Sequence, residues 1–159
     1  MSSQYWVTEP DAEIQIRMGT GYASKPAKTV MDVFKETVTK HGGEPALGLK
    51  RAAKVGGLVP ENWKIWTYKE YYDDCIAFAK TLLFLKVDKH KIVNIIGFNS
   101  PEWFIADVGC MFAGCIASGV YTTNTSDACQ YVLSHSKGEV LVCEDNKQLK
   151  KYADRDPKV

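Results

Sequence analysis

Three short apolar runs alternate with three helix-like stretches in the second half of the chain, and this alternation constrains the fold more than any other feature. The apolar runs lie at 92–96, 119–121 and 139–143, and helices are predicted over about 101–117, 126–135 and 148–152. Strands that alternate with helices typically form right-handed βαβ units around a parallel sheet. The almost continuous apolar run at 92–96 suits a strand that is covered on both faces. The sequence therefore predicts an α/β fold with a mainly parallel sheet.

Two further helices are predicted upstream of this region. Each begins with a capping box, in which a threonine is followed three residues later by an acidic residue: Thr29 with Asp32, and Thr67 with Glu70. Apolar residues at helical spacing extend these helices over about 30–41 and 68–86, and Gly42 follows the first. The same spacing places Leu83 on the buried face of the second helix.

Short β runs at 46–49 and 63–67 lie between these two helices and predict a loose hairpin, because the Gly-containing residues 55–60 separate them. Residues 1–28 show no sustained periodicity and are expected to form an extended lead-in. After the last predicted helix the chain reads Asp-Pro-Lys-Val at 156–159, where a βαβ series would normally supply its next strand. We therefore expect an incomplete domain.

Charge and cysteine content exclude several classes of function. The chain has 20 Lys and Arg against 19 Asp and Glu, so nucleic acid is not an expected partner. Its five cysteines form no CxxC pair, which favours reduced, buried thiols over a disulfide framework or a zinc site. The N-terminus lacks the basic start and apolar run of a signal peptide, and no apolar stretch is long enough to span a bilayer. A cytoplasmic protein is therefore expected.

The turn at 97–102 is the first candidate ligand site, because ligands of parallel sheets collect outside the carboxyl ends of the strands. It has one glycine where a dinucleotide-binding turn has three. Pro101 removes a backbone donor, and Glu102 adds a negative charge. The turn therefore favours a helix cap at Ser100 over a phosphate site.

The turn at 121–126 is the second candidate, since it is rich in hydroxyl and amide groups and follows a predicted parallel strand. Thr122, Thr123 and Asn124 are candidate contacts of a substrate channel. The alternative is a capped, hydrogen-bonded turn, with Ser126 as the cap of the next helix.

The titratable residues form no recognisable catalytic arrangement. His41, His90 and His135 lie at predicted helix ends or in a charged turn, which favours surface roles. Asp73 and Asp74 fall on the polar face of a helix. Cys110 and Cys115 fall on an apolar helix, where burial makes a thiol unreactive. No residue is predicted to be catalytic, to bind a cofactor or to hold a metal.

Several segments, taken in order, closely resemble the early part of the long-chain acyl-CoA synthetases, which belong to the adenylate-forming superfamily. These segments are NIIGFNSPEW at 94–103, GCMFAG at 109–114, GVYTTN at 119–124 and VLVCE at 140–144. With WTY at 66–68 and MGTG at 18–21, they look most like the bubblegum subfamily. The resemblance extends over about residues 14–155.

The resemblance implies that residues 29–159 are the first, truncated part of the large N-terminal domain of an adenylate-forming (AMP-binding) enzyme. The complete enzyme would join a long-chain fatty acid to coenzyme A with ATP and Mg²⁺, releasing AMP and pyrophosphate. In the family, the phosphate loop with its lysine, the Tyr-Gly-x-Thr-Glu segment, the ribose-binding aspartate and the C-terminal catalytic lysine would all lie beyond Val159. We therefore expect no ligase activity from this fragment, and no binding of ATP, Mg²⁺ or coenzyme A.

The resemblance also implies a partner, the missing C-terminal part of the same protein, which would cover apolar faces that the fragment exposes. It leaves open a peripheral contact with the endoplasmic reticulum membrane. Two other interpretations stay open. In the first, the chain is a self-standing, non-catalytic α/β module that binds a partner or a nucleotide. In the second, it is a truncated isoform that regulates the full enzyme.

Overall fold

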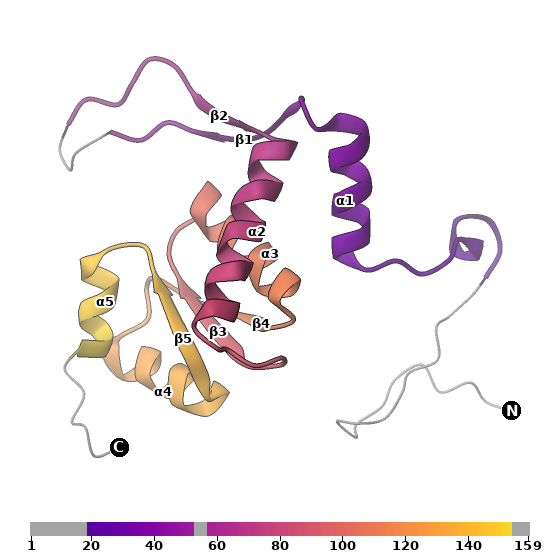
Figure 1. Ribbon diagram of the computed structural model, residues 1–159. Coiled ribbons are helices and arrows are strands. Elements are labelled where there is room, and N and C mark those ends of the chain that lie inside the picture. Colours follow the sequence, from indigo (N-terminus) through magenta and orange to yellow (C-terminus); the bar gives the residue numbers. More distant parts are fainter. Residues whose placement is uncertain (1–18, 53–56, 154–159) are drawn as a thin grey trace, which may run out of the picture.

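The structure, a computed structural model, describes residues 19–52 and 57–153 (Figure 1). In chain order its elements are η1 (Gly21–Ser24), α1 (Val30–His41), β1 (Pro45–Leu49), β2 (Lys64–Thr67), α2 (Tyr68–Phe84), β3 (Ile92–Ile96), α3 (Pro101–Ala113), β4 (Ile116–Val120), α4 (Ser126–Ser136), β5 (Gly138–Cys143) and α5 (Asn146–Ala153). The predicted α/β class is confirmed. Most of the expected lead-in, residues 1–18, lies outside the described residues, as do residues 154–159. The described remainder of the lead-in contains the short 3₁₀ helix η1, so it is not extended throughout.

β3 is the central strand of a three-stranded parallel sheet with the order β4–β3–β5. Its side chains point alternately to the two faces of the sheet. Val93 and Ile95 join the core formed with α2 and α3, whereas Ile96 packs in a second cluster with Cys129 of α4 and Tyr152 of α5. The strand is therefore covered on both faces, as its apolar run predicts.

Asn94 is a polar residue at the centre of this sheet, and it is fully buried. Its Nδ2 donates to Oγ of Ser118 on β4 at 3.2 Å, and Oγ of Ser136, at the end of α4, donates to its Oδ1 at 3.2 Å. Buried polar groups are costly unless they are hydrogen-bonded. The side chain of Asn94 therefore ties the central strand to an edge strand and to the following helix.

The two predicted capping boxes are present. At α2, the backbone N–H of Glu70 donates to Oγ1 of Thr67 at 3.2 Å, and the backbone N–H of Thr67 donates to Oε2 of Glu70 at 2.8 Å. Thr29 and Asp32 make the equivalent pair at α1. Each pair satisfies backbone donors that a helix start leaves without partners.

β1 and β2 pair antiparallel, which confirms the predicted hairpin. Residues 53–56 of its loop lie outside the described residues. In Figure 1 the hairpin extends from the start of α2, and α1 lies beside α2 on the other side. The ring of Phe34 on α1 lies 4.9 Å from that of Tyr71 on α2 and 6.3 Å from that of Phe112 on α3.

The predicted end of the helix at 101–117 is wrong. α3 ends at Ala113, because Gly114 adopts a left-handed conformation with φ of 76° and its N–H donates back to the carbonyls of Cys110 and Met111. This is a common way for a glycine to end a helix. β4 consequently begins at Ile116, three residues before the predicted strand.

Further predictions need correction. α2 ends at Phe84, and Leu83 is exposed rather than buried, because Cys75, Ala79 and Leu82 form the buried face of the helix and Leu83 lies beside that face. Thr125, not Ser126, caps α4, since its side chain accepts the N–H of Ala128. Among the described residues, no helix has the length and apolar character needed to cross a membrane.

Candidate functional site

The candidate site lies at the carboxyl end of β3, where the connections from neighbouring strands diverge. α3, which follows β3, packs on one face of the sheet, whereas α4 and α5 pack on the other. A crevice opens at such a switch point, and ligands of open parallel sheets bind there. Among the described residues, one pocket lies on each side of β3 at this end.

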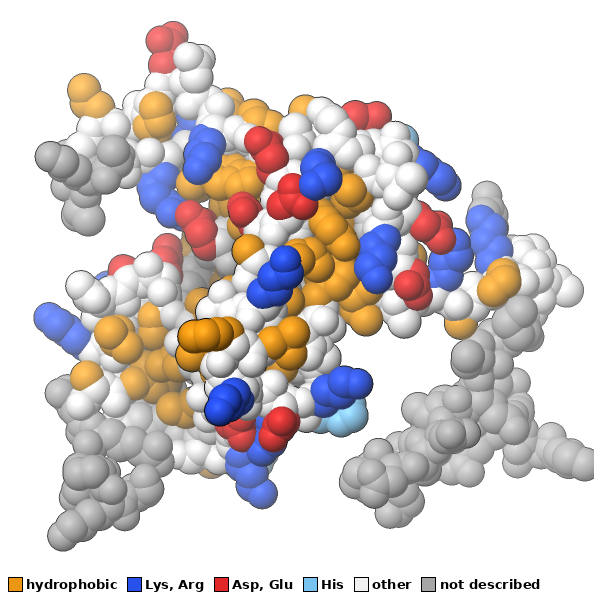
Figure 2. Space-filling view, in the orientation of Figure 1, with side chains coloured by type: hydrophobic (Ala, Val, Ile, Leu, Met, Phe, Trp, Pro, Cys, Tyr) orange, Lys and Arg blue, Asp and Glu red, His pale blue; other side chains and the backbone are white. Residues whose placement is uncertain are grey.

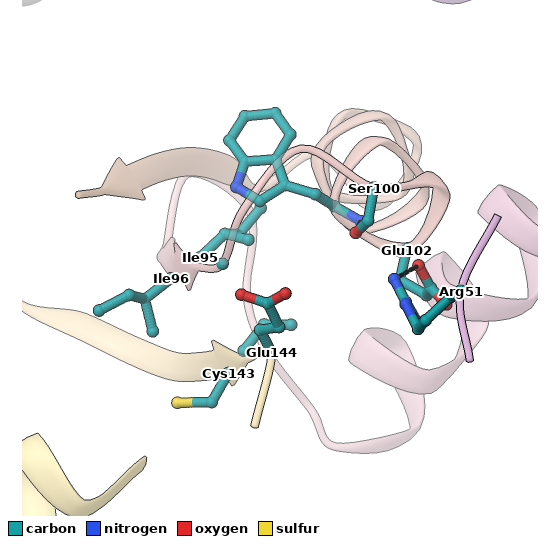
Figure 3. Close-up of a pocket in the computed structure, with 10 residues that line it drawn as sticks. Arg51, Ile95, Ile96, Ser100, Glu102, Cys143 and Glu144 are labelled. Carbon is teal, nitrogen blue, oxygen red and sulfur yellow. Dashed lines mark hydrogen bonds and ion pairs between the residues drawn. The ribbon is translucent and has the colours of Figure 1, made fainter. Parts of the chain in front are cut away.

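The first pocket lies between β3 and β5 and has a volume of about 210 Å³. Figure 3 shows Glu144 pointing into the space beyond the strand ends, and Arg51 facing Glu102. Oε2 of Glu144 accepts the backbone N–H of Phe98 at 2.9 Å, which fixes the turn that follows β3. This carboxylate occupies the position where an anionic ligand would need a donor.

Arg51 and Glu102 form the charged wall of this first pocket. The guanidinium donates two hydrogen bonds to the carboxylate, at 2.9 and 3.1 Å. Partial burial of Glu102 opposes its ionisation, but the hydrogen bonds from Arg51, from the backbone and from Ser100, together with the positive charge of Arg51, outweigh this effect, and the pKa of the carboxyl falls below its usual value. The guanidinium of Arg51 is therefore already paired with the carboxylate of Glu102.

The turn at 97–102 forms the helix cap that the sequence favours. The side chain of Ser100 accepts the N–H of Trp103 at 3.3 Å, and Pro101 occupies the first turn of α3. Serine as the cap followed by proline is a common helix start.

The second pocket lies between β3 and β4 and has a volume of about 500 Å³. Thr122 and Thr123 line it, together with the aromatic side chains of Phe98, Trp103 and Tyr121. The pocket thus combines hydroxyl groups with apolar rings. Such a mixture is typical of sites for small organic ligands.

Asn124, the third candidate, does not line this pocket. Its N–H donates to the carbonyl of Tyr121 at 3.1 Å, so it closes the turn. The turn is held further by Lys151, whose Nζ donates to the carbonyl of Thr122 at 2.6 Å. The run at 121–126 is therefore a capped, hydrogen-bonded turn, and two of its hydroxyl residues also face a pocket.

Sequence reasoning missed Phe98, Trp103 and Glu144 as site residues. Phe98 and Trp103 belong to the turn and helix that follow β3, and Glu144 follows β5. The signal that could have found them is position, since all three lie just beyond the ends of adjacent parallel strands.

The three histidines lie outside both pockets. Nδ1 of His41 lies 2.9 Å from Oε1 of Glu44, and the ring of His135 stacks on Tyr131 at 5.4 Å. His90 occupies an exposed turn with φ of 65°. Asp73 and Asp74 stay at the surface, where Asp73 pairs with Lys69 and Asp74 accepts the indole N–H of Trp66 at 3.1 Å.

Cys75 and Cys110 are expected to be unreactive in the folded chain. Burial raises the pKa of each thiol from 9.0 to about 12, so very little thiolate exists at pH 8. Iodoacetamide at pH 8, followed by peptide mass spectrometry, is expected to label both residues in urea and neither in buffer. Equal labelling in both conditions would contradict this prediction. Burial favours the protonated thiols of Cys75 and Cys110 and so raises their pKa values in the folded chain. The stability that the protonated thiols contribute is therefore complete below pH 9 and is lost as the pH rises towards 12.

Comparisons with known proteins show the family of the chain and its fold. A family model described as "AMP-binding enzyme" matches residues 34–159. The protein named long-chain-fatty-acid–CoA ligase ACSBG2 of Gallus gallus is 43% identical over 148 residues, which are 92% of this chain and 18% of the relative. The mouse protein named long-chain-fatty-acid–CoA ligase ACSBG1 is 38% identical over 146 residues, 92% of this chain and 19% of the relative.

A solved structure, Klebsiella oxytoca NpsA in complex with 3-hydroxyanthranilyl-AMSN, superposes with a TM-score of 0.63 at 25% identity, over 76% of this chain and 22% of that protein. This chain thus spans about a fifth of the length of the curated relatives it matches. The family match covers most of the chain, and the solved structure has the same fold. The chain therefore belongs to the AMP-binding enzyme family and is similar within it to the bubblegum-type long-chain-fatty-acid–CoA ligases.

Proposed function

We propose that this chain is the amino-terminal segment of an ATP-dependent long-chain fatty acid–CoA ligase. The complete enzyme converts a fatty acid, ATP and coenzyme A to acyl-CoA, AMP and pyrophosphate. The observation that carries the proposal is the similarity of 92% of the chain to proteins named as such ligases. The two pockets at the carboxyl end of β3 support it, since they lie where parallel sheets bind ligands.

Within the ligase, the segment supplies a scaffold and one wall of a substrate channel. Thr122 and Thr123 contact the substrate through their hydroxyl groups, beside the rings of Phe98 and Trp103. Asn124 acts indirectly by closing the turn that presents the two threonines.

The complete ligase would use ATP with Mg²⁺, which, when bound, would supply positive charge beside the α-phosphate. Among residues 19–52 and 57–153, no three His, Cys, Asp or Glu residues are grouped so that they could hold a metal. The proposal names no metal ligand and no catalytic residue among these described residues.

The 159-residue chain alone is expected to form no acyl-CoA from palmitate, ATP, Mg²⁺ and coenzyme A, whereas the full-length ligase that contains it is expected to do so. Liquid chromatography with mass spectrometry measures the product. Product from the 159 residues alone would overturn the fragment proposal. Binding of ATP by the 159-residue chain without turnover would favour the alternative, a self-standing binding module.

Replacing both Thr122 and Thr123 with valine in the full-length ligase is expected to raise the KM of the fatty acid or of coenzyme A by about fivefold, because two hydroxyl contacts are lost. Steady-state kinetics with each substrate varied in turn measures this. Thr39→Val is the matched control, since Thr39 is an exposed residue of α1 that lines neither pocket. Unchanged KM values for all substrates would show that the two threonines only shape the turn.

A further inference from the structure

The side chain of Trp103 lies between the two pockets at the carboxyl end of β3. Trp103 and Gly97 line both the smaller pocket, of about 210 Å³, and the larger pocket, of about 500 Å³. Gly97 contributes no side chain, so the indole of Trp103 is the side chain that the two pockets share. The size of this indole therefore decides where each pocket ends.

The indole lies against two glycines of neighbouring strands. Gly97 directly follows β3, and Gly119 belongs to β4. A Cβ atom at Gly97 would lie 3.7 Å from Cδ1 of Trp103, and a Cβ atom at Gly119 would lie 3.5 Å from its Cζ2. The edge of the indole that carries the nitrogen thus spans the ends of both strands. The ring can lie this close to the backbone because neither position has a side chain.

Trp103 is held in place from several sides. Its backbone N–H donates to Oγ of Ser100 at 3.3 Å, at the start of α3. Its ring packs against the main core and lies edge-on to the ring of Phe104 at 5.8 Å. Packing of this kind restricts the rotamers of a side chain. The indole therefore forms a fixed wall of both pockets.

The larger pocket suits an alkyl chain. Its lining combines aromatic rings with two threonine hydroxyl groups, and none of the described residues that line it is charged. The phosphate groups of ATP or coenzyme A would need cationic partners in such a place. An alkyl chain needs only to leave water and contact the rings.

We propose that Trp103 is a specificity-determining residue of the ligase, and that its indole limits the width of the fatty-acid channel at the larger pocket. A straight alkyl chain passes along the indole, whereas a methyl branch on that chain collides with it. Without the indole the two pockets join, and the channel accepts branched chains. This inference rests on the proposed function, because it assigns the larger pocket to the fatty acid of the proposed ligase.

The test compares palmitate with methyl-branched palmitates as substrates of the full-length ligase. Trp103→Leu is expected to raise kcat/KM for the branched substrates, relative to palmitate, by about tenfold, since one methyl group in an apolar pocket changes kcat/KM by at least roughly this factor. Trp103→Phe is expected to shift the ratio in the same direction by less, because its ring is smaller. Liquid chromatography with mass spectrometry measures each acyl-CoA, and circular dichroism melting shows that each variant is folded.

A rescue variant separates the effect of space from a general effect on folding. The 3.5 Å from a Cβ atom at Gly119 to the indole is an ordinary contact distance, so a larger side chain there can occupy the space that Trp103→Leu opens. Adding Gly119→Leu to Trp103→Leu is therefore expected to restore most of the preference for palmitate.

Two control variants are expected to leave the ratio of kcat/KM values unchanged. Phe104→Leu replaces the neighbouring aromatic residue of α3, which lines neither pocket. Val33→Ala removes an apolar contact elsewhere. Apolar side chains gather between α1 and α2 in Figure 2, where Val30 and Val33 line a groove that shares no described residue with the two pockets.

The inference is overturned if folded Trp103→Leu and Trp103→Phe keep the wild-type ratio, or if Gly119→Leu does not restore it. A change confined to the KM of coenzyme A would also overturn it, because a different substrate would then occupy the larger pocket. A wild-type full-length protein that forms no acyl-CoA would overturn the proposed function together with this inference. An active ligase with unchanged selectivity would overturn this inference alone.

Discussion

Gly138→Ala is expected to destabilise the chain by about 3 kcal/mol, because the added methyl group would overlap a buried side chain. A Cβ atom at this position, the start of β5, would lie 1.8 Å from Oδ1 of Asn94 and 2.9 Å from Cδ1 of Leu133. Asn94 cannot move aside without breaking its hydrogen bonds to Ser118 and Ser136. Urea unfolding followed by circular dichroism measures the free energy of unfolding.

A double-mutant cycle tests whether Asn94 is the cause. Asn94→Ala alone is expected to cost about 2 kcal/mol, since it removes two buried hydrogen bonds and leaves a small cavity. In that background, Gly138→Ala is expected to cost much less than in the wild-type chain, because the space opposite is vacant. Additive effects of the two substitutions would contradict this explanation, as would a stable Gly138→Ala variant.

Gly109→Val is expected to have an effect of similar size at the contact between α2 and α3. A Cβ atom at Gly109 would lie 2.9 Å from the backbone carbonyl oxygen of Cys75 and 2.8 Å from Cδ1 of Phe78. In an open helix, replacing glycine usually stabilises. Here the two helices would have to separate, so we expect a loss of about 3 kcal/mol in the free energy of unfolding.

Gly43→Ala is the matched control for both glycine substitutions. A Cβ atom at Gly43 would have no other atom within 4 Å, and its backbone is not left-handed. Its unfolding free energy is expected to stay within about 0.5 kcal/mol of the wild-type value. If Gly109→Val unfolded at the same urea concentration as this control, the explanation that α2 and α3 are too close to admit a side chain at this position would be wrong.

The positions of the helix starts could be predicted because the groups that decide them are close in sequence. Thr29, Thr67 and Ser100 each bond a backbone N–H three residues later, and Pro101 fits the first helical turn. The helix ends were harder to predict. Gly114 ends α3 because the chain must reverse there to enter β4, and nothing in its neighbouring residues distinguishes it from Gly109, which continues the helix.

That Thr122 and Thr123 line a pocket could be predicted for the same reason. A polar run follows an apolar one there, and this pattern is visible locally. Glu144 bonds Phe98 across 46 residues, and Arg51 bonds Glu102 across 51. Such pairs depend on the strand order, which local patterns do not specify.

By itself, the sequence determined the class of the fold, the family and the start of nearly every helix, because periodicity, caps and motifs act over a few residues. Only the tertiary structure decided which residues share a pocket, that Asn94 has hydrogen-bond partners, and that Leu83 to Leu85 lie exposed beyond the core. These features arise where elements distant in sequence pack together. Burial and strand order are properties of that packing and of no single segment.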